Sequence, residues 1–239
     1  MRILGVIPAR YASSRFPGKP LIDLKGKSMI QRVYEGAKKS SLLTNVVVAT
    51  DDNRIVQEVQ SFGGEVMMTD SSHRTGTDRC AEVIANYDCD VVVNIQGDEP
   101  LVNHQQIEAL CGAFVDAEVK IATLGIDTSD KNDLLDPNRI KLVMDRDQNA
   151  LYFSRSAIPN TEKSTVDEHP FIRHIGLYAY RKETLIALSK LVPTQLEKTE
   201  SLEQLRWLFN GYSIRVVKTE IETPNIDVPE DVKNVLPFL

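Results

Sequence analysis

Short apolar segments that alternate with amphipathic ones constrain the fold of this chain more than any other feature. Asn45–Thr50 (NVVVAT) is apolar without alternation, and the segment DVVVNIQGDEP begins in the same way at Asp90. Strands with this pattern are buried on both faces of a parallel sheet, whereas half-exposed strands alternate apolar and polar residues. Because helical patterns separate these runs, the chain is predicted to form a doubly wound, mostly parallel α/β sheet.

The individual elements follow from the same patterns. Ser28–Lys39 places Met29, Ile30, Val33 and Ala37 on one face, as a helix over a sheet requires. Asp51 or Asp52 is expected to cap the next helix, and Gly63 to end it. The predicted elements of the first half are strands at Ile3–Pro8, Asn45–Thr50, Glu65–Met68, 90–94 and Ile121–Ile126, and helices at Ser28–Lys39, Asp51–Gly63, Thr77–Asn86 and His104–Ala117.

The second half is less regular. Its predicted elements are strands at Arg139–Met144, His174–Tyr180 and Ser213–Lys218, and helices at Lys182–Lys190, Glu200–Asn210 and Pro229–Val235. Asn160–Pro170 is polar and without periodicity, which is typical of an exposed loop. We therefore expect a single domain over residues 1–239, with a smaller inserted α+β lobe around residues 127–190.

Composition and charge limit the classes of function. Of the 239 residues 42% are hydrophobic, and the net charge is −6, which argues against nonspecific nucleic-acid binding and a polybasic membrane anchor. No apolar stretch approaches the roughly 20 residues that span a bilayer. Three cysteines without metal-ligand spacing and four histidines without an HxxxH pair argue against structural zinc. We expect a cytoplasmic protein with reduced cysteines and no membrane or nucleic-acid partner.

A basic loop follows the first predicted strand. It carries Arg10, Arg15 and Lys19, and Gly18 allows a close turn around a ligand. Ligands of open α/β sheets bind at the carboxyl ends of the strands, so Arg15 and Lys19 are placed to neutralise a triphosphate. The alternative is a solvated basic loop. The segment matches neither GxxxxGK[ST] nor GxGxxG, which argues against a P-loop, a dinucleotide site and an NAD-dependent dehydrogenase.

Two acidic residues are candidate metal ligands. Asp98 follows the buried strand in VVVNIQGDEP, and a carboxylate at a strand end suits Mg²⁺, which takes few protein ligands and completes its shell with water and phosphate. Asp227, in NIDVPEDV, supplies a second carboxylate if the sheet brings it near Asp98. For each residue, a helix N-cap is the alternative interpretation.

Three further segments carry polar groups. In Ser71–Arg79 (SSHRTGTDR), Thr75 and Thr77 precede a helix whose first amides could meet a base or a phosphate, although a plain capped helix start explains them as well. In the strand His174–Tyr180, the side chains of His174 and Tyr178 lie on the same face. That face is either solvated or lines a hydroxyl-rich pocket. Residues 203 and 204 lie off the leucine stripe of their helix, where they accept sugar hydroxyls or face solvent.

Taken together, the motifs resemble one family. IPARYASSRFPGKPL, VATDD, HRTGTDR, VNIQGDEP, RHIGLYAYR, LEKTESLEQLRWL and IDVPEDV occur in the order found in 3-deoxy-manno-octulosonate cytidylyltransferases (CMP-Kdo synthetases), and the resemblance runs end to end. It implies a nucleotide-diphospho-sugar-transferase-like fold and the Mg²⁺-dependent reaction of CTP with Kdo to give CMP-Kdo and pyrophosphate. It also implies a cytoplasmic homodimer that serves lipopolysaccharide synthesis.

The resemblance assigns roles to single residues. The CTP loop would contain Pro8, Ala9, Arg10, Arg15 and Lys19, and further nucleotide contacts would come from Thr77, Arg79 and Gln96. The metal would be held by Asp98 and Asp227, and catalysis would depend on Lys19, Arg15 and Asp98. The sugar acid would contact Arg155, His174, Tyr178, Glu203 and Gln204.

Some alternatives remain open at this stage. Val228 stands where the family often has Thr, and the loop Asn160–Pro170 is shorter than in some members. Enzymes that use an 8-amino form of the sugar are close relatives, and CMP-sialate synthetases share the sheet and the CTP loop. A noncatalytic nucleotide sensor is the alternative from another class, although it would need neither two metal carboxylates nor a second pocket.

Overall fold

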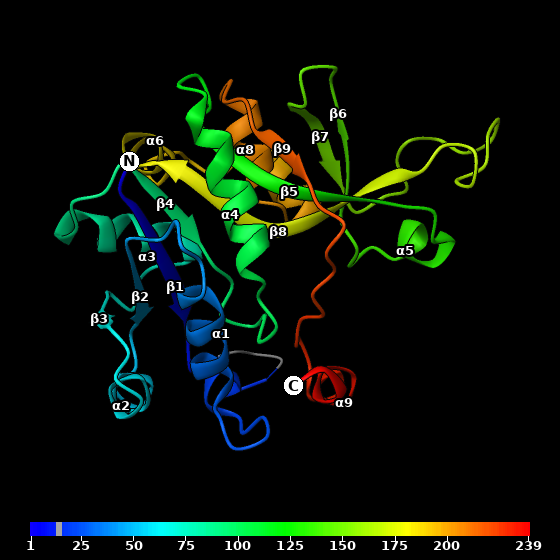
Figure 1. Cartoon of the computed structure of the whole chain (residues 1–239). Coiled ribbons are helices and arrows are strands. Elements are labelled where there is room, and N and C mark those ends of the chain that lie inside the picture. Colours follow the sequence, from blue (N-terminus) through cyan, green and yellow to red (C-terminus); the bar gives the residue numbers. More distant parts are fainter. Residues whose placement is uncertain (13–15) are drawn as a thin grey trace. The chain divides into compact units, whose positions relative to one another are not determined.

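The computed structural model describes residues 1–12 and 16–239 (Figure 1). The chain divides into two compact units. The first unit comprises Met1–Cys111 and Glu222–Leu239, so the end of the chain returns to the unit in which it begins, and the second comprises Gly112–Ile221. The expected single domain with a lobe around residues 127–190 stays a prediction.

A parallel sheet forms the centre of the first unit. Its strands are β1 (Ile3–Ala9), β2 (Asn45–Thr50), β3 (Val66–Met68) and β4 (Val91–Asn94). They lie in the order β3-β2-β1-β4, and every pair is parallel. All four residues of β4 and the last five of β2 are buried, as the continuous apolar runs predicted.

Side-chain caps set where the first three helices of this unit begin. The helices are α1 (Met29–Lys38), α2 (Asn53–Ser61), α3 (Gly76–Val83), α4 (His104–Gly112) and α9 (Val232–Val235), with short 3₁₀ turns at Lys19–Leu21, Ile84–Asn86, Pro229–Asp231 and Leu236–Phe238. The Ser28 hydroxyl caps α1, and Asp52 rather than Asp51 caps α2. Thr75 and Asp78 form a capping box at the start of α3. The predicted helix starts are therefore confirmed to within a residue or two.

The second unit is mixed rather than parallel. Its sheet centres on β5 (Ile121–Thr128), which pairs antiparallel with β8 (Phe171–Arg181) and parallel with β9 (Arg215–Lys218). β6 (Lys141–Met144) pairs antiparallel with β7 (Ala150–Ser154) and with β8. The helices are α5 (Lys131–Leu135), α6 (Lys182–Leu188), α7 (Gln195–Glu200) and α8 (Gln204–Phe209), with a 3₁₀ turn at Ala113–Val115.

One predicted helix is wrong in its first part. The sequence pattern indicated a single helix over Glu200–Asn210, but Glu200 is the last residue of α7 and α8 begins only at Gln204. Between them Ser201 takes a left-handed conformation with φ of 52°, which ends the first helix. The short elements α5, β7 and α7 were not predicted, because five or six residues give too few periods for a pattern.

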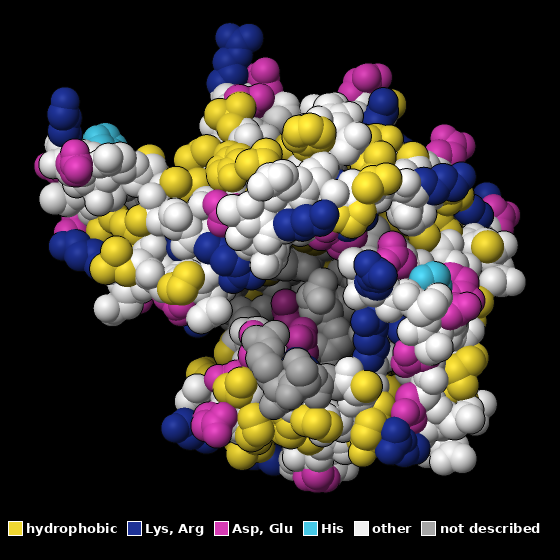
Figure 2. All heavy atoms as spheres, turned by 180° about the vertical axis from the view of Figure 1, so that it is seen from behind, with side chains coloured by type: hydrophobic (Ala, Val, Ile, Leu, Met, Phe, Trp, Pro, Cys, Tyr) yellow, Lys and Arg dark blue, Asp and Glu magenta, His cyan; other side chains and the backbone are white. Residues whose placement is uncertain are grey.

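The loop predicted at residues 160–170 is present in the structure. Residues 160–170 contain neither helix nor strand, although Val166 is buried in a small cluster with Leu134 and Phe171. On the face drawn in Figure 2, Lys and Arg side chains are intermixed with Asp and Glu among the described residues. Within the described part of the chain, no helix has both the length and the apolar character needed to cross a membrane. All three cysteines are buried.

Candidate active site

The carboxyl ends of β1, β2 and β4 meet at one edge of the first unit's sheet. Ala9 pairs with Thr50, and Val6 pairs with Asn94, so the loops after these strands start side by side. A Cβ atom on Gly97 would lie 2.7 Å from the carbonyl oxygen of Pro8, closer than real Cβ contacts. Only glycine therefore lets the loop after β4 approach the end of β1 this closely.

Lys19 joins two acidic side chains at this edge. Its Nζ donates a hydrogen bond of 2.9 Å to Asp98 Oδ2 and lies 4.0 Å from Asp227 Oδ1. Its second hydrogen bond, of 2.8 Å, goes to the carbonyl oxygen of Ile226. The lysine side chain is 13% exposed, and the side chains of Asp98 and Asp227 are 29% and 40% exposed. The two predicted metal ligands and the predicted triphosphate lysine are thus brought together.

Backbone contacts hold this cluster in place. The amide of Ile226 donates a 3.0 Å hydrogen bond to the carbonyl oxygen of Asp98, which ties the C-terminal segment to the loop after β4. Gly18, with φ of 75°, donates its N–H to the carbonyl oxygen of Tyr11 and directs the chain into the turn that begins at Lys19. That left-handed conformation favours glycine.

The other residues of the predicted CTP loop lie at the end of β1. Pro8 is half-buried, Ala9 is buried, and the half-buried Arg10 donates a hydrogen bond to the carbonyl oxygen of His73. Burial, and then the charge of Arg79, lowers the pKa of Arg10 from its usual value, partly offset by nearby acids. Arg15 lies outside the described residues.

The first turn of α3 contains a buried arginine, Arg79. The Arg79 side chain is fully buried, and its guanidinium donates to Asp51 Oδ2 at 3.1 Å and to the Thr69 hydroxyl. It thereby ties α3 to the loop after β2. Thr77 is also buried, and Gln96 is half-buried in the loop after β4. The predicted contacts of Thr77, Arg79 and Gln96 with a nucleotide stay predictions.

Glu99 behaves differently from its neighbour Asp98. Both acids follow the strand in VVVNIQGDEP, but Glu99 is buried. Burial, and then the charge of Asp98, raises its pKa to about 8, so it carries a proton at neutral pH. Asp98 alone of this pair reaches Lys19. Among the described residues no group of three or more His, Cys, Asp or Glu side chains is placed to hold a metal ion. The assignment of Asp98 and Asp227 as metal ligands stays a prediction.

The second unit encloses the predicted sugar-binding aromatics. The ring of His174 lies 5.3 Å from that of Tyr178, which stacks on Tyr180 at 6.0 Å. Trp207 of α8 meets both tyrosines edge-on, and Phe153 of β7 meets His174 edge-on at 5.1 Å. Since Tyr178 is 7% exposed and Tyr180 is fully buried, the two tyrosines are packed and not solvated, whereas His174 on the same face is half-buried.

Burial keeps both candidate ligand groups neutral. It lowers the pKa of His174 to about 3, so the imidazole is uncharged at neutral pH. It raises the pKa of Tyr178 well above the usual value. In the same cluster, the Thr123 hydroxyl lies 2.9 Å from His174 Nε2. Thr123 was not singled out from the sequence, because nothing in its local pattern distinguishes it from other strand residues.

The remaining predicted sugar contacts surround the junction of α7 and α8. Arg155 donates to the carbonyl oxygens of Glu200 at 2.6 Å and Pro137 at 2.8 Å. Gln204 is 6% exposed. The Oε1 atom of Glu203 lies 3.9 Å from an Nη atom of Arg206. Arg206 is buried, and the sequence did not single it out. Arg206 also bonds both carboxylate oxygens of Glu197, at 2.5 and 2.8 Å. Direct contacts of Arg155, Glu203 and Gln204 with a sugar stay predictions.

Comparison with known proteins places the chain in a family. The cytidylyltransferase family model matches residues 4–218. The 3-deoxy-manno-octulosonate cytidylyltransferase of Parabacteroides distasonis is 50% identical over 249 residues, which cover 100% of this chain and 98% of the relative. The chain belongs to the 3-deoxy-manno-octulosonate cytidylyltransferase family. The family member from Geobacter metallireducens is 47% identical and covers 99% of this chain and 97% of its own length.

Solved structures agree with this assignment. CMP:2-keto-3-deoxy-manno-octonic acid synthetase, solved in complex with CTP, matches with a TM-score of 0.94 and 41% identity over 100% of this chain and 98% of that one. A cytidylyltransferase from Leptospira borgpetersenii matches with a TM-score of 0.65 and 16% identity, which shows a shared fold only. The family and the α/β fold class inferred from sequence are therefore confirmed.

Proposed function

We propose that this chain is a nucleotidyltransferase that joins CTP and 3-deoxy-D-manno-octulosonate (Kdo) to give CMP-Kdo and pyrophosphate. The observation that carries the proposal is the convergence of Lys19 with Asp98 and Asp227 in a member of this cytidylyltransferase family. A lysine and two carboxylates at the carboxyl edge of a parallel sheet provide complementary charges for a triphosphate and a divalent cation.

The basic residues bind the triphosphate. An ammonium group has three donors, and among the described residues Lys19 uses two of them on Asp98 and Ile226, so the third N–H can serve a phosphate oxygen. Arg10 contributes further N–H donors beside β1. Lys19, together with Arg15, stabilises the charge that develops on the departing pyrophosphate. The nucleotide subsite is shaped by Thr77, Arg79 and Gln96. Arg79 acts indirectly, because its guanidinium holds the Asp51 carboxylate by a hydrogen bond.

The two acids fit Mg²⁺. Both carboxylates are partly exposed, and both lie within 4.0 Å of the same ammonium nitrogen. Mg²⁺ is commonly held by one or two carboxylates, with water and substrate phosphates completing its octahedron. We assign Asp98 and Asp227 as its ligands. When bound, the ion polarises the α-phosphate and lowers the pKa of the attacking hydroxyl.

The main task of the protein in this reaction is to align the two substrates. The anomeric 2-hydroxyl of Kdo attacks the α-phosphorus of CTP, a new P–O bond forms, and the bond to the β-phosphate oxygen breaks. Reactions of this class place little covalent work on the protein, so the rate depends on alignment and charge stabilisation. Kdo contacts come from Arg155, His174, Tyr178, Glu203 and Gln204, and the neutral His174 and Tyr178 suit hydroxyl groups.

We extend the proposal to the cellular setting. The product serves lipopolysaccharide synthesis, and the enzyme acts in the cytoplasm, where three buried thiols remain reduced. It acts as a homodimer. Analytical ultracentrifugation at micromolar concentrations tests this last point, and a single monomeric species would contradict it.

A pyrophosphate-release assay tests the activity. The purified chain is incubated with CTP and Mg²⁺ and with Kdo, 8-amino-Kdo or sialate in separate reactions. Release that is fastest with Kdo is the expected result. Preference for 8-amino-Kdo or sialate would reassign the substrate, and no release with any sugar acid would favour a nucleotide sensor.

A further inference from the structure

The Thr123 hydroxyl lies at an irregular point of the second unit's sheet. The β5–β8 pairing shifts register there, because Thr123 pairs with Tyr178 while the next residue, Leu124, pairs with Ile175. Two extra residues of β8 are accommodated at this point. A bulge of this kind often redirects a side chain beside an active site.

Three polar groups of β8 surround this hydroxyl. Thr123 Oγ1 lies 2.9 Å from His174 Nε2, 2.9 Å from the carbonyl oxygen of Leu177 and 3.3 Å from the carbonyl oxygen of Ile175. Thr123 is fully buried, so the hydroxyl has to satisfy its hydrogen bonds with these protein groups.

Counting protons fixes the direction of these bonds. A hydroxyl has one proton to donate, and carbonyl oxygens only accept. If Thr123 donated to His174, its lone pairs would face the Leu177 carbonyl oxygen at 2.9 Å with no proton between them. If it donates to Leu177, its lone pairs are free to accept from a protonated Nε2. The second arrangement places the proton on the shorter carbonyl contact and leaves only the longer 3.3 Å contact with the Ile175 carbonyl oxygen unpaired, so it is favoured.

The other ring nitrogen is then an acceptor. Burial lowers the pKa of His174 to about 3, so the ring carries one proton at neutral pH. With that proton on Nε2, Nδ1 holds a lone pair. His174 is half-buried, whereas Thr123 is fully buried.

We propose that Thr123 is a positioning residue that fixes His174 in the Nε2–H tautomer, so that Nδ1 accepts a hydrogen bond from a hydroxyl of the sugar acid. This inference rests on the proposed function for the identity of the ligand. It commits His174 to recognising a hydroxyl, because a lone pair on Nδ1 repels the sugar's carboxylate.

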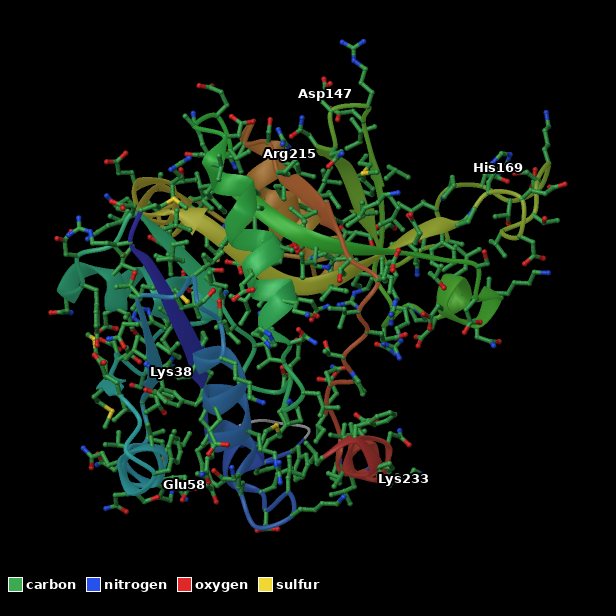
Figure 3. The ribbon with its side chains drawn as sticks, viewed as in Figure 1. Lys38, Glu58, Asp147, His169, Arg215 and Lys233 are labelled. Carbon is green, nitrogen blue, oxygen red and sulfur yellow. The ribbon has the colours of Figure 1, made fainter. Side chains whose placement is uncertain are left out.

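Nitrogen-15 NMR of the histidine rings tests the tautomer without substrate. His174 is one of four histidines, and its signals are assigned by their loss in His174→Gln. His169, in the loop 160–170, is exposed and provides an internal reference for a solvated ring (Figure 3). The expected result at pH 7 is a pyrrole-type Nε2 and a pyridine-type Nδ1 for His174. An Nδ1–H tautomer or an imidazolium would overturn the inference, whether or not the enzyme is active.

Kinetics test the positioning role with a matched pair of variants. Thr123→Val keeps the shape but removes the hydroxyl, and Thr123→Ser keeps the hydroxyl. We expect Thr123→Val to lower kcat/KM for Kdo by about 10- to 100-fold, with KM for CTP changed less than about twofold, and Thr123→Ser to stay near wild type. Unchanged kcat/KM for Kdo in folded Thr123→Val would overturn the role. If Thr123→Val does not fold, the wild-type NMR result still decides the tautomer. Lack of pyrophosphate release by the wild type would instead overturn the proposed function.

Discussion

Gly97→Ala tests whether the active-site edge depends on the close approach of two loops. The added Cβ would lie 2.7 Å from the carbonyl oxygen of Pro8, whereas ordinary contacts start at 3.4 Å. The loop after β4 must therefore move by about 0.7 Å, and Asp98 is the next residue along it. A shift of this size disturbs the 2.9 Å hydrogen bond between Asp98 and Lys19.

The expected effect is larger on activity than on stability. Misplacement of catalytic groups by about 1 Å costs up to about 100-fold, so we expect kcat/KM in the pyrophosphate-release assay to fall by about 10- to 100-fold. Overpacking costs about 1–3 kcal/mol, and each kcal/mol lowers Tm by about 2–4 °C in a chain of this size.

Gly112→Ala is the matched control. An added Cβ there meets nothing within 4 Å, so activity should stay at the wild-type value and Tm should not fall. The reasoning would be refuted if Gly97→Ala kept wild-type kcat/KM, because the loop would then tolerate the displacement without loss of alignment.

Three further predictions concern single side chains. Asp98→Asn should lower kcat by about 10²–10³-fold with little change in Tm. The control variant Asp147→Asn, at an exposed position (Figure 3), should leave kcat unchanged. A normal kcat for Asp98→Asn would argue against Asp98 as a metal ligand. Lys19→Ala should raise KM for CTP by about 10- to 100-fold and KM for Kdo much less; equal losses would contradict its triphosphate role. Burial holds the pKa of His174 at about 3, below its unfolded value, so stability is lost as pH falls from about 6.5 toward 3. Between pH 7 and 5 chemical denaturation should show wild type losing up to about 2 kcal/mol more than His174→Gln, and equal losses would argue against a buried neutral ring.

The first unit's sheet could be predicted from sequence because its signals are local. Asn45–Thr50 is apolar without interruption, and Asp52 and Gly63 mark the ends of one helix within a dozen residues. A continuous apolar run and a helix cap are each formed by a few consecutive residues, so both can be recognised in a single sequence.

The convergence at Lys19 could only be hypothesised. Lys19 meets Asp98, 79 residues away, and the carbonyl of Ile226, 207 residues away. The chain builds the entire second unit before Glu222–Leu239 returns to the first. No local pattern encodes that return, so from the residues alone Asp227 could be offered as a metal ligand only on the condition that the fold brings it near Asp98.

Burial of polar residues was also beyond local reasoning. The resemblance assigned Arg79 a nucleotide contact, but no local pattern indicated that its side chain is fully buried and hydrogen-bonded to Asp51 and Thr69. The register shift opposite Thr123 depends on the pairing of strands about 50 residues apart, which alternation within one strand does not reveal.

A crystal structure of the enzyme with CTP and Mg²⁺ tests the central claim most directly. We expect the ion to be ligated by Asp98 and Asp227 and the triphosphate to contact Lys19. An ion bound without either carboxylate, or a triphosphate bound away from the turn that begins at Lys19, would contradict the account.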